Sequence, residues 1–157
     1  MLPKFHILFG LIFSGIVLFI FPQIQLSGFL IIWASSVLID IDHYLYYVYR
    51  KKDWNLNNSF NWFIDLSKKY NKLSIEQREK VYFGFYFLHG AEAILILLIF
   101  IYFFQNIILI YILIGFLFHQ LLDLIDLYIK KMKSYKLVSF LYSIHKKKGK
   151  KYIEEIN

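Results

Sequence analysis

The chain has 157 residues and a formal charge of +7, and 59% of its residues are hydrophobic. An ordinary soluble domain of this size is nearer half apolar and could not bury so much apolar surface, so the composition predicts one compact membrane protein. The absence of cysteine excludes disulfides and thiolate ligands. Lysines beside apolar runs usually meet lipid headgroups on the cytoplasmic side, so we expect the lipid bilayer as partner, and no nucleic acid.

The first third of the chain predicts two membrane-spanning helices. Residues 5–39 contain no Asp, Glu, Lys or Arg, and a crossing needs only about 20 helical residues. The first helix is expected over residues 5–21, because Pro22 cannot continue it. The second is expected from Ile24 through Asp42 to Tyr49, where tyrosines suit the headgroup level.

A polar stretch follows over residues 50–80. Within it, residues 59–70 mix aromatic and basic side chains and predict a short amphipathic helix lying on the membrane. Ser74 and Gln77 have the spacing of a capping box. We therefore expect a third helix that begins near Ser74, enters the membrane near Val81 and ends near Phe104.

The last third predicts a fourth span over residues 107–129 and a basic tail over residues 130–157, which is expected to form a surface helix. The fold class is thus all-α, a four-span bundle of residues 1–129 with an insertion at 50–80. Lys and Arg are absent from the turns after Phe21 and Phe104. Both termini and the insertion are therefore predicted to be cytoplasmic, in a multi-pass membrane protein.

Each predicted span carries imidazole or carboxylate groups near its cytoplasmic end. At about 1.5 Å per residue from the outer turns, most of them lie roughly 18–24 Å deep, in one layer. Ionisable groups inside a bilayer are costly and indicate function, and His with Asp and Glu is a ligand set for divalent metals. The predicted metal ligands are His6, Asp40, Asp42, His43, His89, Glu92, His119 and Asp123.

The spacing of these residues indicates how they would bind. Residues three or four apart share a helix face, so His89 with Glu92 and His119 with Asp123 are each expected to form a two-donor clamp, as are Asp40 and His43. So many ligands exceed one tetrahedral zinc and predict two bridged ions, Zn²⁺ or Mn²⁺. Asp42 and Glu92 are the candidate catalytic carboxylates, Asp42 as ligand or general base, and Asp126 is expected to orient His119.

Three sequence elements together resemble the YdjM-like membrane-bound metal-dependent hydrolases. They are His6 near the start, Asp40-Ile41-Asp42-His43 after an apolar span, and His119 with Asp123 on a late span. In that family an N-terminal His, Asp-x-Asp-His and His-x-x-x-Asp recur on membrane helices. The resemblance covers residues 5–129 apart from the polar middle. It implies a hydrolase, and the depth of the site suggests a lipid phosphoester or similar amphiphile at the cytoplasmic leaflet.

The chain departs from the family at one element. The family pattern is His-Arg-Gly-x-Thr-His, whereas this chain has His89-Gly90-Ala91-Glu92. Glu can replace His as a ligand, but the missing Arg leaves substrate and catalysis open. Arg78 is expected further outward on the same helix, as a headgroup contact.

Two other classes of function stay open. Intramembrane His and carboxylates also build ion or proton pathways, although the apolar outer halves of the spans favour a one-sided site. The polar layer could instead only pack helices in a non-catalytic scaffold, as hydrogen-bonded pairs do between membrane helices.

Overall fold

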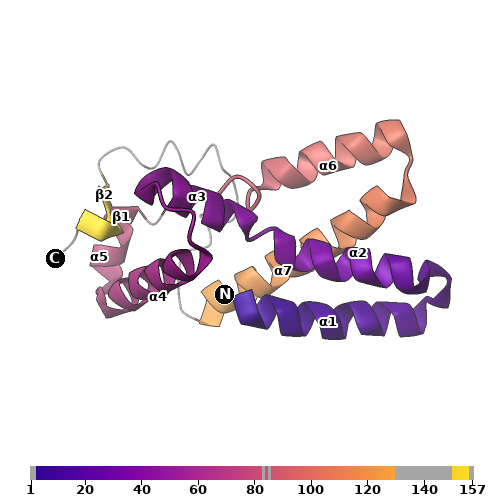
Figure 1. Ribbon diagram of the computed structural model, residues 1–157, viewed down its shortest axis with the longest axis horizontal. Helices are drawn as coiled ribbons and strands as arrows, with labels where there is room; N and C mark the ends of the chain where they lie inside the picture. Colours follow the sequence, from indigo (N-terminus) through magenta and orange to yellow (C-terminus); the bar gives the residue numbers. More distant parts are fainter. Residues whose placement is uncertain (1–2, 83, 85, 130–149, 156–157) are drawn as a thin grey trace.

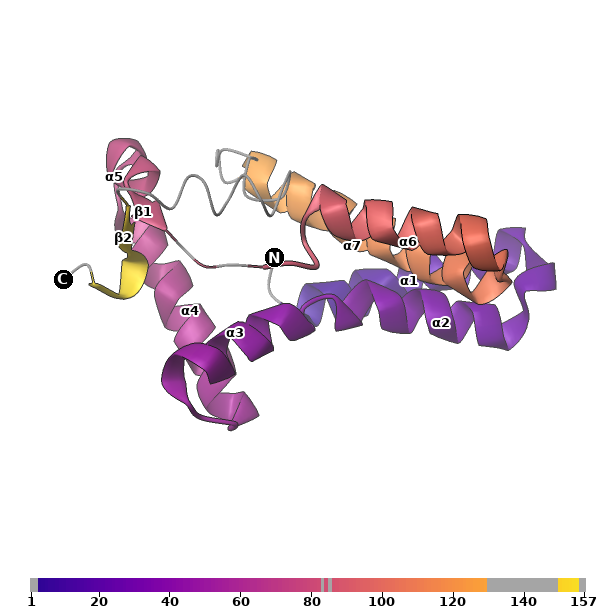
Figure 2. The same cartoon turned by 90° about the horizontal axis from the view of Figure 1, so that it is seen from above.

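The computed structural model describes residues 3–82, 84, 86–129 and 150–155, which form a long helical bundle with a smaller lobe at one end (Figures 1 and 2). The bundle contains α1 (Pro3–Ile20), α2 (Gln25–Leu38), α6 (Ala91–Phe104) and α7 (Ile107–Ile129). The turn between α1 and α2, η1 (Pro22–Ile24), lies at the same end of the bundle as the turn between α6 and α7. The helical class predicted from sequence is therefore confirmed for the described residues, apart from one two-residue strand pair.

Two helical stretches are long and apolar enough to cross a membrane, Pro22–Lys51 and Ile107–Ile129. The helices α1 and α6 are apolar but shorter. Large apolar side chains face outward along the bundle, such as Phe19 at 86% exposure and Phe103 at 73%. These features support membrane association by length and composition, and the four-span arrangement stays a prediction.

Small residues let the bundle helices approach closely. A Cβ on Gly115 of α7 would lie 2.3 Å from the carbonyl oxygen of Ile32, and one on Gly10 of α1 would lie 2.2 Å from Ser36 Oγ, both on α2. Such distances leave no room for a methyl group, so α2 packs backbone to backbone against α7, as small residues permit in membrane helices. This packing brings the ends of α1, α2 and α7 together.

The second predicted span is broken at Ile39 and Asp40. The helix α2 stops at Leu38, and α3 (Ile41–Lys51) begins three residues later. Across the break the amide of Asp40 bonds to Val37 and that of His43 bonds to Asp40, three residues back instead of four. This tighter winding lets α3 leave the bundle axis (Figure 2).

The lobe contains α4 (Leu56–Lys72), α5 (Ile75–Glu79), and β1 (Val81–Tyr82) paired in parallel with β2 (Lys151–Tyr152), followed by η2 (Ile153–Glu155). The helix expected over residues 59–70 is present as α4, but its Leu66 and Tyr70 pack inward with Val81 and Ile153. The capping box of Ser74 and Gln77 is also present, at the start of α5.

The continuous helix predicted from Ser74 to Phe104 is wrong. The helix α5 ends at Glu79, and α6 begins only at Ala91, after β1 and an irregular segment. Gly84 has φ of +159°, a backbone conformation that helix does not use and other residues rarely adopt. His89 therefore precedes α6, and it does not share a helix face with Glu92.

Arg78, which was expected to contact headgroups, forms hydrogen bonds within the lobe. Its Nε donates to the carbonyl of Leu73 at 3.0 Å and its Nη2 to that of Asn71 at 2.9 Å. These bonds occupy carbonyls at the end of α4, so Arg78 holds α4 and α5 together. The predicted tail helix falls largely on residues 130–149, outside the described residues.

Candidate metal centre

Histidine and aspartate side chains from every long bundle helix except α6 converge where the bundle meets the lobe. His6 comes from α1, His119 and Asp123 from α7, Asp40 from the α2–α3 break, and His89 from the segment before α6. His6 and His119 are 0% exposed, and His89 is 2% exposed. Buried imidazole and carboxylate groups at this density require compensation by hydrogen bonds, protons or metal ions.

Asp42 and a backbone carbonyl orient three imidazole rings. Asp42 Oδ2 accepts from His89 Nδ1 and from the amide of Leu88, both at 3.0 Å, while its Oδ1 accepts from His43 Nδ1 at 2.9 Å. His119 Nδ1 donates to the carbonyl oxygen of Ser36 at 2.8 Å. Both oxygens of Asp42 thus accept hydrogen bonds, and this carboxylate fixes the orientation of the His43 and His89 rings.

These bonds fix the chemistry of the opposite ring nitrogens. Because Nδ1 donates in both rings, Nε2 of neutral His89 and His119 carries a lone pair. The two Nε2 atoms lie 3.2 Å apart. Two facing lone pairs would repel, so this contact requires either a proton on one nitrogen, which makes it a hydrogen bond, or a metal ion bound by both.

Two carboxylate oxygens lie near both of these nitrogens. Asp40 Oδ1 lies 3.5 Å from His89 Nε2 and 3.7 Å from His119 Nε2. Asp123 Oδ2 lies 3.6 Å and 3.5 Å from the same two atoms. We call Asp40 Oδ1, His89 Nε2, His119 Nε2 and Asp123 Oδ2 the four-donor cluster.

The distances around His89 Nε2 and His119 Nε2 resemble those within a metal coordination shell. Zinc–nitrogen and zinc–oxygen bonds of about 2.0–2.1 Å in a tetrahedron place neighbouring ligands about 3.3–3.4 Å apart. The two nitrogens lie 3.2 Å from each other and 3.5–3.7 Å from the two carboxylate oxygens. Each carboxylate oxygen, together with the two nitrogens, is therefore spaced to bind a divalent ion.

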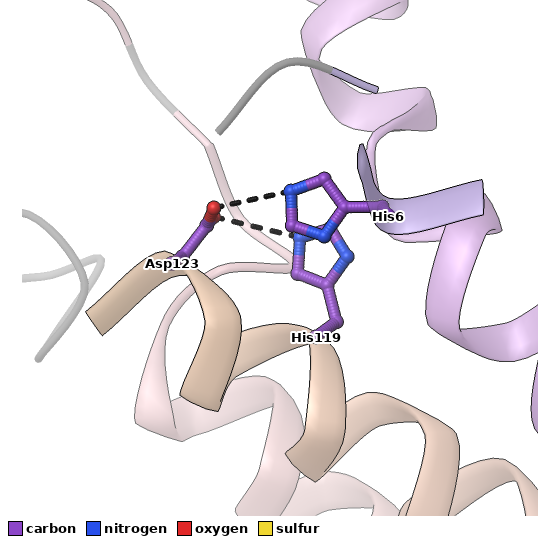
Figure 3. Close-up of side chains that lie close together, drawn as sticks. All are labelled: His6, His119 and Asp123. Carbon is purple, nitrogen blue, oxygen red and sulfur yellow. Dashed lines mark ion pairs between the residues drawn. The ribbon is translucent and has the colours of Figure 1, made fainter. Parts of the chain in front are cut away.

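His6 lies beside this cluster, and its ring nitrogens lack hydrogen-bond partners. Its ring stacks on that of His119 at 3.9 Å, and its Nε2 lies 3.2 Å from Asp123 Oδ1 (Figure 3). The contact lacks hydrogen-bond alignment, and both ring nitrogens of His6 are buried without a hydrogen-bond partner, as is Asp40 Oδ2. Buried polar atoms are normally satisfied, so these atoms indicate a place for a further ligand.

The structure brings most of the predicted ligands together. Among the described residues, two groups could hold a metal ion, His6 with His119 and Asp123, and Asp40 with His43 and His89. Glu92 lies in the first turn of α6 and belongs to neither group. Its role as a ligand, and that of Asp126 in orienting His119, stay predictions. The carbonyl of Ser36 gives no residue-type signal in the sequence, so its part in the site could not be foreseen.

The comparisons with family models, with curated proteins and with solved structures returned no match to this chain. The fold and the site by themselves define a helical, membrane-associated protein with a buried His and Asp cluster that could hold a divalent metal.

Proposed function

We propose that the protein is a membrane-embedded metal-dependent hydrolase that acts on a phosphoester or lipid-like substrate at the cytoplasmic leaflet. The four-donor cluster carries this proposal, because its two imidazole nitrogens both lie within 3.7 Å of two carboxylate oxygens. The resemblance to the YdjM-like hydrolases supports the reaction class. Divalent ions in such a site supply Lewis acidity and an activated water for ester cleavage.

Two ions fit this site better than one for hydrolysis. The described donors fall into two groups of three, His6 with His119 and Asp123, and Asp40 with His43 and His89. Each group would hold one ion, and three protein ligands would leave that ion a position for water. The nitrogen-rich donor set suits Zn²⁺ or Mn²⁺.

The carboxylates take different parts in this proposal. Asp40 keeps one oxygen, Oδ2, buried without a hydrogen-bond partner, so it is available to accept the proton of an attacking water. Asp42 has N–H donors on both oxygens, and it holds His43 and His89 in place instead of acting as general base.

We also propose that all four bundle helices cross the membrane, with the lobe in the cytoplasm. The turns at the far end carry no Lys or Arg, whereas the lobe is rich in lysine. The segment before the short α6 would complete its crossing, since irregular backbone is tolerated inside a membrane where protein surrounds it. Cysteines introduced at Asn71 and Asn106 should label from opposite sides, and labelling from one side would contradict this topology.

The test of the hydrolase proposal combines metal content with turnover. Elemental mass spectrometry of the purified protein should find two divalent ions per chain, and a phosphoester screen should find metal-dependent hydrolysis. The substitutions Asp40→Asn and His119→Ala should abolish turnover and reduce bound metal, because each removes a donor that no neighbour replaces. Asp65→Asn, on an exposed carboxylate of α4, is the matched control and should change neither.

Ion transport is the second candidate, and the buried imidazole and carboxylate groups inside the proposed membrane bundle favour it, because such groups also build ion pathways. Bound metal without turnover on any ester, together with metal flux into liposomes, would establish transport and contradict hydrolysis. A protein that binds no metal would contradict both hydrolysis and metal transport and would favour a non-catalytic scaffold.

A further inference from the structure

The turn between α3 and α4 presents large apolar side chains outward. Trp54 is 72% exposed, Tyr49 is 70% and Leu56 is 67%. Exposed aromatic groups gathered on a small lobe indicate a binding surface. We call Tyr49, Lys52, Trp54, Leu56 and Phe60 the α3–α4 corner.

Hydrogen bonds build this corner rigidly. Lys52 ends α3 in the left-handed conformation, with φ of 56°. Asp53 accepts hydrogen bonds from the Tyr47 hydroxyl, from the Asn58 side chain and from the Asn55 amide, and these bonds lower the pKa of the Asp53 carboxyl below its ordinary value. The Tyr44 hydroxyl donates to the carbonyl of Trp54 at 2.8 Å. The indole is therefore held outward by an ordered turn.

The corner lies at the depth of lipid headgroups if α2 crosses the membrane as proposed above. From Gln25 at the outer turn to Lys51, the helix path is about 39 Å at 1.5 Å per residue. The hydrocarbon core is about 30 Å thick and the bilayer with headgroups about 40–45 Å. Because α3 bends away from the bundle axis and α4 runs across it (Figure 2), the corner lies at the side of the bundle and not above it.

The side chains of the corner fit this depth chemically. Trp and Tyr are enriched where membrane meets water, since their rings are apolar with one polar atom. Lys52 is exposed, and its Nζ lies 5.0 Å from the centre of the Tyr49 ring. Asp53, the carboxylate of this turn, is engaged within the turn by three hydrogen bonds.

We propose that the α3–α4 corner docks into the anionic headgroup layer of the cytoplasmic leaflet and holds the lobe against the membrane beside the metal centre. This proposal rests on the membrane topology proposed above, and it does not depend on hydrolysis. Trp54 and Leu56 enter the headgroup boundary, and Lys52 meets lipid phosphates.

Spin labels can test this docking because the chain has no cysteine. The label is placed at Leu56→Cys, with Glu76→Cys on the exposed side of α5 as matched control, in phosphatidylcholine vesicles with and without phosphatidylglycerol. Collisions with oxygen should exceed collisions with a nickel chelate at residue 56, and the order should reverse at residue 76. Adding Trp54→Ala and Lys52→Gln should shift the residue 56 label toward the value of the control.

The other outcomes overturn the proposal. A residue 56 label as open to the nickel chelate as the control would show that the corner faces water. Spin–spin broadening between labels at residue 56 would show that a second copy covers the corner. Metal content and turnover are measured on the same samples, so a docked corner without hydrolysis would contradict only the hydrolase, and hydrolysis with a water-exposed corner would contradict only the docking.

Discussion

Two histidine tautomers decide what the buried cluster can bind. The Nδ1 bonds from His89 to Asp42 and from His119 to the Ser36 carbonyl place the two Nε2 atoms 3.2 Å apart, where both can bind one cation. A ring without such a bond could turn or protonate on the wrong nitrogen. The metal-binding capacity therefore depends on residues that do not touch the ion.

Asp42→Asn tests this dependence. An amide side chain offers one acceptor oxygen, so it cannot accept from both His43 and His89 as the carboxylate does. Metal affinity should fall about 10–100-fold, the usual effect of losing such a partner. Competition with a chelating dye measures it, with Asp65→Asn as control, and an unchanged affinity would show that Asp42 does not position the rings.

The stability of the α3–α4 turn depends on pH through Asp53. Hydrogen bonds, first from Tyr47, lower the pKa of the folded carboxyl below the ordinary value of about 3.9. Stabilisation from this group is therefore full above the ordinary pKa and is lost as pH falls toward the folded one. The thermal midpoint of Asp53→Asn should lie below that of the natural protein at pH 7, and the gap should close below about pH 4. A gap that is constant with pH would contradict this assignment.

At the scale of elements, the site depends on how closely α2 and α7 approach. Gly115 meets the backbone of α2 around Ile32, one turn from His119. A wider separation would move His119 away from the Ser36 carbonyl and from Asp40. Close packing at this crossing is thus a condition for the four-donor cluster.

Gly115→Ala should separate the two helices and lower stability by about 1–3 kcal/mol, as overpacking of a well-packed interior does. Metal affinity should fall with it. Gly15→Ala is the matched control on α1, since a Cβ there meets nothing within 4 Å. Thermal unfolding in detergent measures the difference, and equal midpoints for the two variants would contradict the close crossing.

At the scale of the whole molecule, residues 151–153 hold the segment that carries His89. β2 pairs with β1, and Ile153, 2% exposed, packs with Leu66, Tyr70 and Val81. The segment after β1 contains Tyr86, whose ring stacks on His43 at 3.9 Å, and it ends at His89. The lobe therefore links β2 and Ile153 to the segment that reaches the metal centre.

Ile153→Ala should destabilise the lobe by about 2–5 kcal/mol, the usual loss for a large aliphatic core residue. Hydrogen exchange at residues 81–89 should rise, and metal affinity should fall. Glu154→Gln, which removes only partly exposed ion pairs with Arg50 and Lys51, should cost about 1 kcal/mol or less. Faster exchange without any change in metal affinity would show that the lobe does not support the metal site.

The apolar helices, the capping box at Ser74 and the ionisable residues near one end of each apolar run could be predicted from the sequence. These follow from local composition and from helical rise, which depend only on neighbours along the chain. The sequence could not show that residues 80–90 leave the helix, because β1 forms only against a strand about 70 residues later. Three features of the site emerge only in the folded chain: Asp42 holds two rings, Ser36 orients His119, and the His6 nitrogens lack hydrogen-bond partners. They depend on which atoms of distant segments are brought within about 3 Å.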